Sequence, residues 1–136
     1  MKFNHIGIAV ESIERYFQDI LGPLFDCKMK SRIYTDPLQD SRVAFVETAD
    51  GSTIELIEPL SPASPVSTIL RNKRGGLHHL CFMADNFEND LAKLKKSKFV
   101  LVSSPKKAIA FNNRKIAFFL SPSNELIEII EPEKQS

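Results

Sequence analysis

Two histidines stand where metal ligands would be expected. His5 opens the apolar segment HIGIAV and His79 opens HLCFMA, and in each segment a small residue, Gly7 or Cys81, follows two positions later. Residues two apart in an extended strand share a face. Because a metal ion needs room beside the imidazole that binds it, small neighbours on that face favour a ligand role for both histidines.

Two glutamates interrupt apolar runs in the same way. Glu55 lies in TIELIEP and Glu128 in LIEIIEP, so both are expected in mid-strand. A buried carboxylate costs several kcal/mol unless it is paired, protonated or bound to a cation. Two imidazoles and two carboxylates suit a borderline divalent ion such as Ni, Co, Zn or Fe. Four protein ligands in an octahedron would leave two adjacent positions for neighbouring oxygens of a substrate.

An internal repeat links these residues in pairs. Residues 42–59, RVAFVETADGSTIELIEP, align without a gap with residues 115–132, KIAFFLSPSNELIEIIEP, at an offset of 73, which is 115 minus 42. The segments led by His5 and His79 match at an offset of 74. A lone histidine is more often a hydrogen-bonded core residue than a ligand, but here each His recurs with its Glu. Pseudo-twofold symmetry would bring all four side chains to one cleft.

The elements between these residues repeat as well. Apolar residues recur at helical spacing over 13–21, and Gly22-Pro23 is the expected stop. In the second half, Asp85 and Glu88 have the spacing of a capping box at the start of a helix. Hairpin turns are expected at Asp50-Gly51 and at residues 121–124. Each half therefore predicts the order βαβββ.

These elements predict an α+β fold in which two tandem βαβββ modules form a curved mixed sheet around a metal cleft. We expect residues 1–136 to form a single domain, with module one at about 1–60, a connector at about 61–76 and module two at about 77–132. Within the connector, Ser64 can cap a short helix whose first turn holds Pro65.

Composition excludes several function classes. The chain is 43% hydrophobic and 26% charged with a formal net charge of +1, so it has the globular mixture and no global field that would draw it to nucleic acid or a membrane. The N-terminus has no signal-peptide or membrane-spanning pattern, and a cytoplasmic location is expected. Cys27 and Cys81 are too few for a disulfide framework, and both are expected to be reduced.

Three motifs, NHIGIAV, IELIEPLSPASPV and GGLHHLCF, resemble the vicinal oxygen chelate superfamily over nearly the whole chain. Within that superfamily they look most like methylmalonyl-CoA epimerase and its glyoxalase-like, lactoylglutathione-lyase-like relatives. The resemblance implies a divalent metal held by His5, Glu55, His79 and Glu128, with Glu128, or else Glu55, leaving the metal to act as catalytic base. It also implies a small thioester or hemithioacetal as substrate and a homodimer as the assembly. The expected reaction is abstraction of a proton next to a carbonyl, as in an epimerase acting on a CoA thioester.

One departure from the epimerase pattern keeps other activities open. The epimerases carry a second catalytic Glu shortly before the strand that is expected here from Val43, whereas this chain reads DPLQDSRV and offers Gln39 or Asp40. A glyoxalase I-like lactoylglutathione lyase is the main alternative. An extradiol dioxygenase uses two histidines and one carboxylate, and a drug-binding resistance protein binds its ligand without a metal. The four-residue ligand set argues against both.

Overall fold

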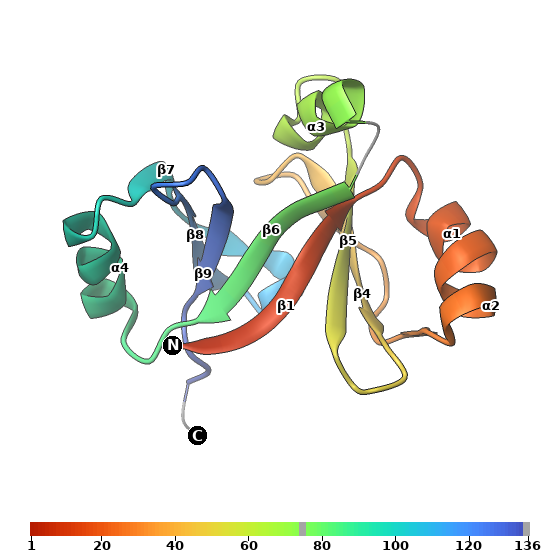
Figure 1. Ribbon diagram of the computed structural model, residues 1–136, viewed down its shortest axis with the longest axis horizontal. Coiled ribbons are helices and arrows are strands. Elements are labelled where there is room, and N and C mark those ends of the chain that lie inside the picture. The colour runs from red at the N-terminus through yellow and green to blue at the C-terminus, as the bar shows by residue number, and fades with distance from the viewer. Residues whose placement is uncertain (74–75, 135–136) are drawn as a thin grey trace. The chain divides into compact units, whose positions relative to one another are not determined.

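The computed structural model describes residues 1–73 and 76–134 (Figure 1). The chain divides into two compact units. The first unit is His5–His78, and the second combines Met1–Asn4 with His79–Ser136. Residues 74 and 75 of the expected connector lie outside the described residues.

The first unit contains most of one βαβββ module and the connector. Its elements, in chain order, are β1 (Lys2–Ala9, from His5 onward), α1 (Ile13–Tyr16), a π-helical turn (Phe17–Leu21), α2 (Gly22–Phe25), β2 (Lys28–Met29), β3 (Tyr34–Asp36), β4 (Ser41–Glu47), β5 (Thr53–Pro59) and α3 (Pro65–Lys73). The strands pair in the order β2-β4-β5-β1. β3 lies outside this order and pairs with the first residues of β4. β1 and β5 run parallel, whereas β4 is antiparallel to its neighbours.

The second unit repeats this plan. Besides the start of β1, its elements are β6 (Gly76–Met83, from His79 onward), α4 (Phe87–Lys96), β7 (Val100–Ala108), a 3₁₀ turn (Ile109–Phe111), β8 (Arg114–Leu120) and β9 (Leu126–Ile130). The strands pair in the order β6-β9-β8-β7, with β6 and β9 parallel and the other two pairs antiparallel. The predicted fold class, α+β with two βαβββ modules and mixed strand directions, is confirmed.

The helical segment of the first unit begins as predicted and ends later than predicted. The side chain of Ser12 accepts a hydrogen bond from the backbone N–H of Arg15, which caps α1. The predicted stop at Gly22-Pro23 is wrong, because the helix continues through Phe25 and ends at Asp26, whose φ is +53°. The π-helical turn before Gly22 shifts the hydrogen-bond register, so that Pro23 falls in the first turn of α2, where its missing N–H costs nothing.

The cap of α4 differs from the predicted capping box by one residue. Asn86, and not Asp85, is the N-cap, and its side chain accepts a hydrogen bond from the N–H of Asn89. The buried carboxylate of Asp90 accepts two more hydrogen bonds, from the N–H groups of Asp85 and Asn86. The backbone N–H groups around the start of α4 are therefore hydrogen bonded both by the N-cap side chain and by Asp90 within the helix.

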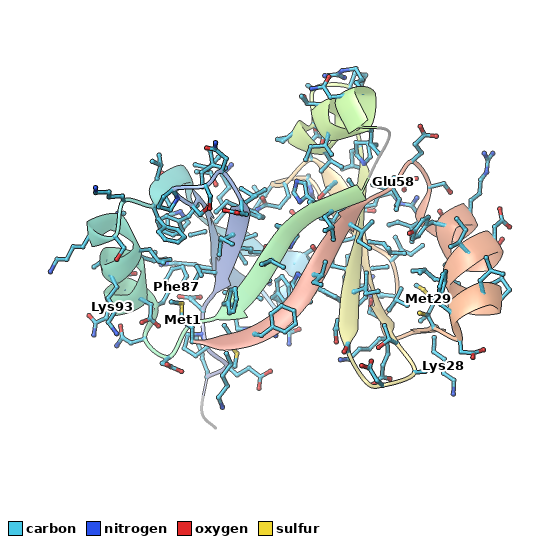
Figure 2. All side chains as sticks on the ribbon, in the orientation of Figure 1. Met1, Lys28, Met29, Glu58, Phe87 and Lys93 are labelled. Atoms are coloured by element: carbon cyan, nitrogen blue, oxygen red, sulfur yellow. The ribbon has the colours of Figure 1, made fainter. Side chains whose placement is uncertain are left out.

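Each unit has its own apolar core between the helix and one face of its strands (Figure 1). In the first unit Ile13 and Leu21 pack with Leu56 of β5, and in the second unit Phe87, labelled in Figure 2, and Leu91 pack with Phe119 of β8. The opposite face of the strands is left for the polar residues described below.

The remaining predicted connections are confirmed. The turns at Asp50-Gly51 and at residues 121–124 close their hairpins, with Gly51 at a φ of +87°. In the connector, Ser64 accepts a hydrogen bond from the N–H of Val66, and α3 starts at Pro65. Both cysteines are free and buried, as expected. Among the described residues, no helix combines the length and the apolar character needed to cross a bilayer.

Candidate metal centre

The first unit places His5 beside Glu55. The parallel register of β1 and β5 sets Gly7 opposite Glu55, so His5 lies on the same face, two residues before that pair. The imidazole Nε2 is 3.7 Å from Glu55 Oε1. His5 is 0% exposed and Glu55 is 4% exposed.

The second unit places His79 beside Glu128 in the same manner. The parallel register of β6 and β9 sets Cys81 opposite Glu128, and His79 again lies two residues before that pair. Here His79 Nε2 is 3.2 Å from Glu128 Oε1, and both side chains are buried.

An aromatic ring from the neighbouring antiparallel strand packs against each imidazole. Phe45 lies opposite Glu55, and its ring contacts His5 edge to face at 5.5 Å between centroids. Phe118 lies opposite Glu128 and contacts His79 in the same way at 5.6 Å. The repeat seen in the sequence therefore extends to strand register and ring packing within each unit.

The donor atoms of each pair fit a divalent cation. A separation of 3.7 Å between Nε2 and Oε1 is too long for a direct hydrogen bond, although both atoms are buried. Two ligands bound at right angles to one cation, each with a bond of about 2.1 Å, lie roughly 3 Å apart, close to the separations in both pairs. Imidazole nitrogen with carboxylate oxygen is a donor set that Zn, Ni, Co and Fe accept. Each unit thus supplies a buried His/Glu pair suited to metal binding.

The segment that holds Gln39 and Asp40 is a tight turn before β4. The strand begins at Ser41, two residues earlier than the expected start at Val43. The buried carboxylate of Asp36 accepts hydrogen bonds from backbone N–H groups of the turn, including that of Gln39. Asp40, at a φ of +51°, accepts a hydrogen bond of 2.6 Å from the hydroxyl of Ser61. Gln39 is an amide and cannot serve as a base, whereas Asp40 is a carboxylate already engaged by a hydroxyl.

The sequence did not reveal a charged cluster between α1 and the strands β4 and β5. Arg42 of β4 donates hydrogen bonds to Glu58 of β5 and to Glu14 of α1, the second at 2.8 Å. The hydrogen bond from Arg42 lowers the pKa of Glu14. In the second unit the corresponding glutamate, Glu131, accepts a hydrogen bond from the backbone N–H of Lys115. Glu58 and Glu131 therefore both have structural partners.

Comparisons with known proteins agree with this architecture. The family model for the glyoxalase/bleomycin resistance protein/dioxygenase superfamily matches residues 4–118. The uncharacterized protein YqjC of Bacillus subtilis is 32% identical over 97% of this chain and 93% of its own length. The mitochondrial methylmalonyl-CoA epimerase of Mus musculus is 32% identical over 90% of this chain and 67% of its own length. The crystal structure of methylmalonyl-CoA epimerase from Mycobacterium tuberculosis superposes with a TM-score of 0.84 at 21% identity, covering 98% of this chain and 89% of that one. From the family match and these relatives, the chain belongs to the glyoxalase/bleomycin resistance protein/dioxygenase superfamily.

Proposed function

We propose that the protein is a metal-dependent epimerase or isomerase that removes a proton next to the carbonyl of a CoA thioester. The observation that carries this proposal is the buried His/Glu pair that recurs at the same strand register in both units. The epimerases among its relatives support the reaction type, and their name supplies the substrate class.

The proposed ligand set joins the two pairs in a single domain, so that His5, Glu55, His79 and Glu128 hold one divalent ion. When bound, such an ion acts as a Lewis acid that stabilises negative charge developing on a substrate carbonyl oxygen. The histidines bind as neutral imidazoles, and the rings of Phe45 and Phe118 fix their orientation.

Glu128 is the proposed catalytic base, with Glu55 as the other candidate. Both carboxylates are buried and lie in mid-strand, and each lies beside the imidazole of its own unit. In that role the buried carboxylate would accept the substrate proton away from bulk water, which favours transfer to and from carbon.

Glyoxalase I-like activity is the second candidate, because position 39 holds a Gln and not the second catalytic Glu of the epimerases. Gln39 cannot take up a proton, and Asp40 is hydrogen bonded to Ser61. This leaves the two glutamates of the pairs as the obvious bases. They suffice for isomerising a hemithioacetal to lactoylglutathione, which is the lyase reaction.

Solvent-deuterium exchange tests the proposed reaction directly. Protein loaded with Ni, Co, Zn or Fe is incubated with methylmalonyl-CoA in D₂O, and mass spectrometry follows deuterium at the carbon next to the thioester. Exchange that depends on metal and is lost after chelation is the expected result. Turnover of the methylglyoxal-glutathione hemithioacetal without any exchange into methylmalonyl-CoA would instead establish the lyase.

We also propose that the protein is a homodimer. β7 ends the strand order of the second unit and presents exposed valines, with Val100 63% and Val102 53% exposed. An edge strand with apolar side chains is suited to contact with another chain. Light scattering after size exclusion gives the mass in solution, and a monomer at micromolar concentration would contradict the assembly.

A further inference from the structure

In the segment from β2 to β3, cationic side chains stand at every second position from Lys28 to Arg32. The segment's sequence, KMKSRIY, places Lys30, Arg32 and Tyr34 two residues apart, so that in an extended chain they share one face. Ile33 faces the other way and packs against the apolar core of the first unit. Ser31 holds the segment to β4, because its hydroxyl accepts a hydrogen bond from the N–H of Phe45. We call Lys30, Arg32 and Tyr34 the cationic strip.

The cationic strip lies on the face of the first unit that carries His5 and Glu55. Tyr34 is directly opposite Val43 in the antiparallel pair of β3 and β4, and opposite residues project to the same face. Val43 is two residues from Phe45, whose ring contacts His5, so all three share that face.

Lys30 gives an independent contact with the same face. Its ammonium donates a hydrogen bond of 3.0 Å to the hydroxyl of Thr53 on β5. Thr53 lies two residues before Glu55 on that strand, which separates their backbones by roughly 7 Å along one face. The ammonium of Lys30 is therefore held at about the length of one small acyl group from Glu55, the proposed metal ligand.

Both cations keep donors available to a ligand. Within the residues that the structure describes, neither Lys30 nor Arg32 forms an ion pair, and both are exposed. An ammonium has three N–H donors, and Thr53 takes one of them. The guanidinium of Arg32 stacks over the ring of Tyr34 at 4.5 Å, which orients it while leaving its in-plane N–H groups at the edge.

We propose that the cationic strip binds an anionic oxygen group of the substrate. The inference rests on the proposed function, because it assumes that the substrate reaches the His5/Glu55 face. The chemistry recognised is an anionic oxygen group, and a CoA ester of a dicarboxylic acid has two sources of it: the acyl carboxylate and the phosphates of the carrier. Arginine and lysine recognise both through charge-assisted hydrogen bonds.

Two probes separate these sources in the metal-loaded protein. Methylmalonate presents the carboxylates without the carrier, and adenosine 3′,5′-bisphosphate presents the phosphates without the acyl group. Each is titrated while ¹⁵N–¹H spectra follow the backbone amides of residues 28–36 and 53–55. We expect the double substitution Lys30→Gln, Arg32→Gln to weaken binding of one probe by at least about tenfold, in keeping with the loss of charge-assisted hydrogen bonds.

The matched control is Lys93→Gln, Lys95→Gln on α4, which removes the same charge from exposed positions of the second unit (Figure 2). It should leave both dissociation constants within about twofold, because these lysines belong to a different element and exposed charges are screened by salt. Metal content and thermal midpoint establish that each variant is folded. The charge-keeping Lys30→Arg should retain most of the affinity.

The cationic strip is refuted if neither probe binds at millimolar concentration, or if the strip variant binds both probes as tightly as the control does. A failure of the proposed function looks different, because probe binding needs no turnover. Methylmalonyl-CoA that shows no deuterium exchange while the strip still discriminates its probe would overturn the reaction and leave the anion site standing. Exchange at the wild-type rate and KM in the strip variant would overturn the anion site alone.

Discussion

At the scale of single residues, the proposed function depends on the two imidazole–carboxylate pairs. A carboxylate that lies buried in mid-strand is costly without a cation or a proton to compensate it. That cost recurs in both units, where Glu55 and Glu128 are 4% and 2% exposed. Buried carboxylates with such an unfavourable free energy are often found at binding or catalytic sites.

The two glutamates offer a matched pair of substitutions. Glu128→Gln in metal-loaded protein should lower the exchange rate by about 10²–10⁴-fold, the usual loss for a general base, because the amide can still bind the ion but cannot take up the proton. Glu55→Gln, at the same register of the first unit, is the matched control and should cost less. Deuterium exchange and elemental analysis are measured on both. The roles would have to be exchanged if Glu55→Gln proved the more damaging of the two while both variants kept their metal.

These four ligand candidates could be predicted from the sequence because each interrupts an apolar strand and each recurs in the repeat. Lys30 and Arg42 could not be predicted in this way. The partner of Lys30 is Thr53, and those of Arg42 are Glu14 and Glu58, all remote in sequence. Such contacts depend on which strands pair and in which register, and a one-residue slip would turn each side chain to the other face.

At the scale of elements, each helix packs against one face of its strands and leaves the other face to the His/Glu pair. The periodicity predicted the apolar face of the first helix, since packing follows residue spacing. It did not predict the π-helical turn before Gly22 or the one-residue shift of the cap to Asn86. Both depend on local hydrogen-bond arrangements whose alternatives differ little in energy. The packing of a whole apolar face separates its alternatives by more.

The cap of α4 can be located by substitution. Asn86→Ala should lower the free energy of unfolding by about 1 kcal/mol, because it removes the acceptor for the N–H of Asn89. Asp85→Ala should change it by less than about 0.5 kcal/mol, since that side chain is 70% exposed and pairs only with the terminal amine. Urea unfolding measures both. A larger effect at Asp85 would restore the capping box predicted from the sequence.

Arg42 joins α1 to β5 through two carboxylates, and its contribution should depend on pH. The pKa of Glu14 is lowered in the folded state by the hydrogen bond from Arg42, relative to an ordinary value of 4.5. Stability from a depressed carboxyl pKa is fully present above the unfolded value and is lost as pH falls through the folded one. Arg42→Met should therefore cost about 1 kcal/mol at pH 7, discounted for the partial exposure of Glu14, and less below about pH 4.

Thermal midpoints between pH 3 and pH 8 measure this difference. The matched control is Lys115→Met, the equivalent position in the second unit, where the side chain is exposed and backbone groups of Lys115 form the hydrogen bonds with Glu131. A cost for Arg42→Met that stayed constant across the whole range would show that lost packing, and not the ion pairs, explains it.

At the scale of the whole molecule, the proposed ion would bind only the native fold, because its ligands lie far apart in the chain. Binding to the native state alone stabilises it by RT ln(1 + [L]/Kd), about 2.7 kcal/mol at a hundredfold excess over Kd. Metal-loaded protein should therefore melt several degrees above chelated protein, with about one ion per chain by elemental analysis. His5→Ala and His79→Ala should each abolish most of this difference. An equal midpoint with and without chelator would argue against a metal centre.

The parallel pairing of the first and last strands of each unit also has a consequence for synthesis on the ribosome. β1, which holds Gly7, can pair with β5 only after Glu55 has been synthesised. β6, which holds Cys81, can pair with β9 only after Glu128 has been synthesised. At roughly 5–20 residues per second, the 48 residues from position 7 to position 55 take about 2–10 s to be made. During that interval the apolar segment HIGIAV is outside the ribosome with no strand to pair with. Chaperone capture or aggregation of nascent chains should therefore be most frequent in chains whose β1 has left the ribosome and whose β5 has not, and should fall once β5 has emerged.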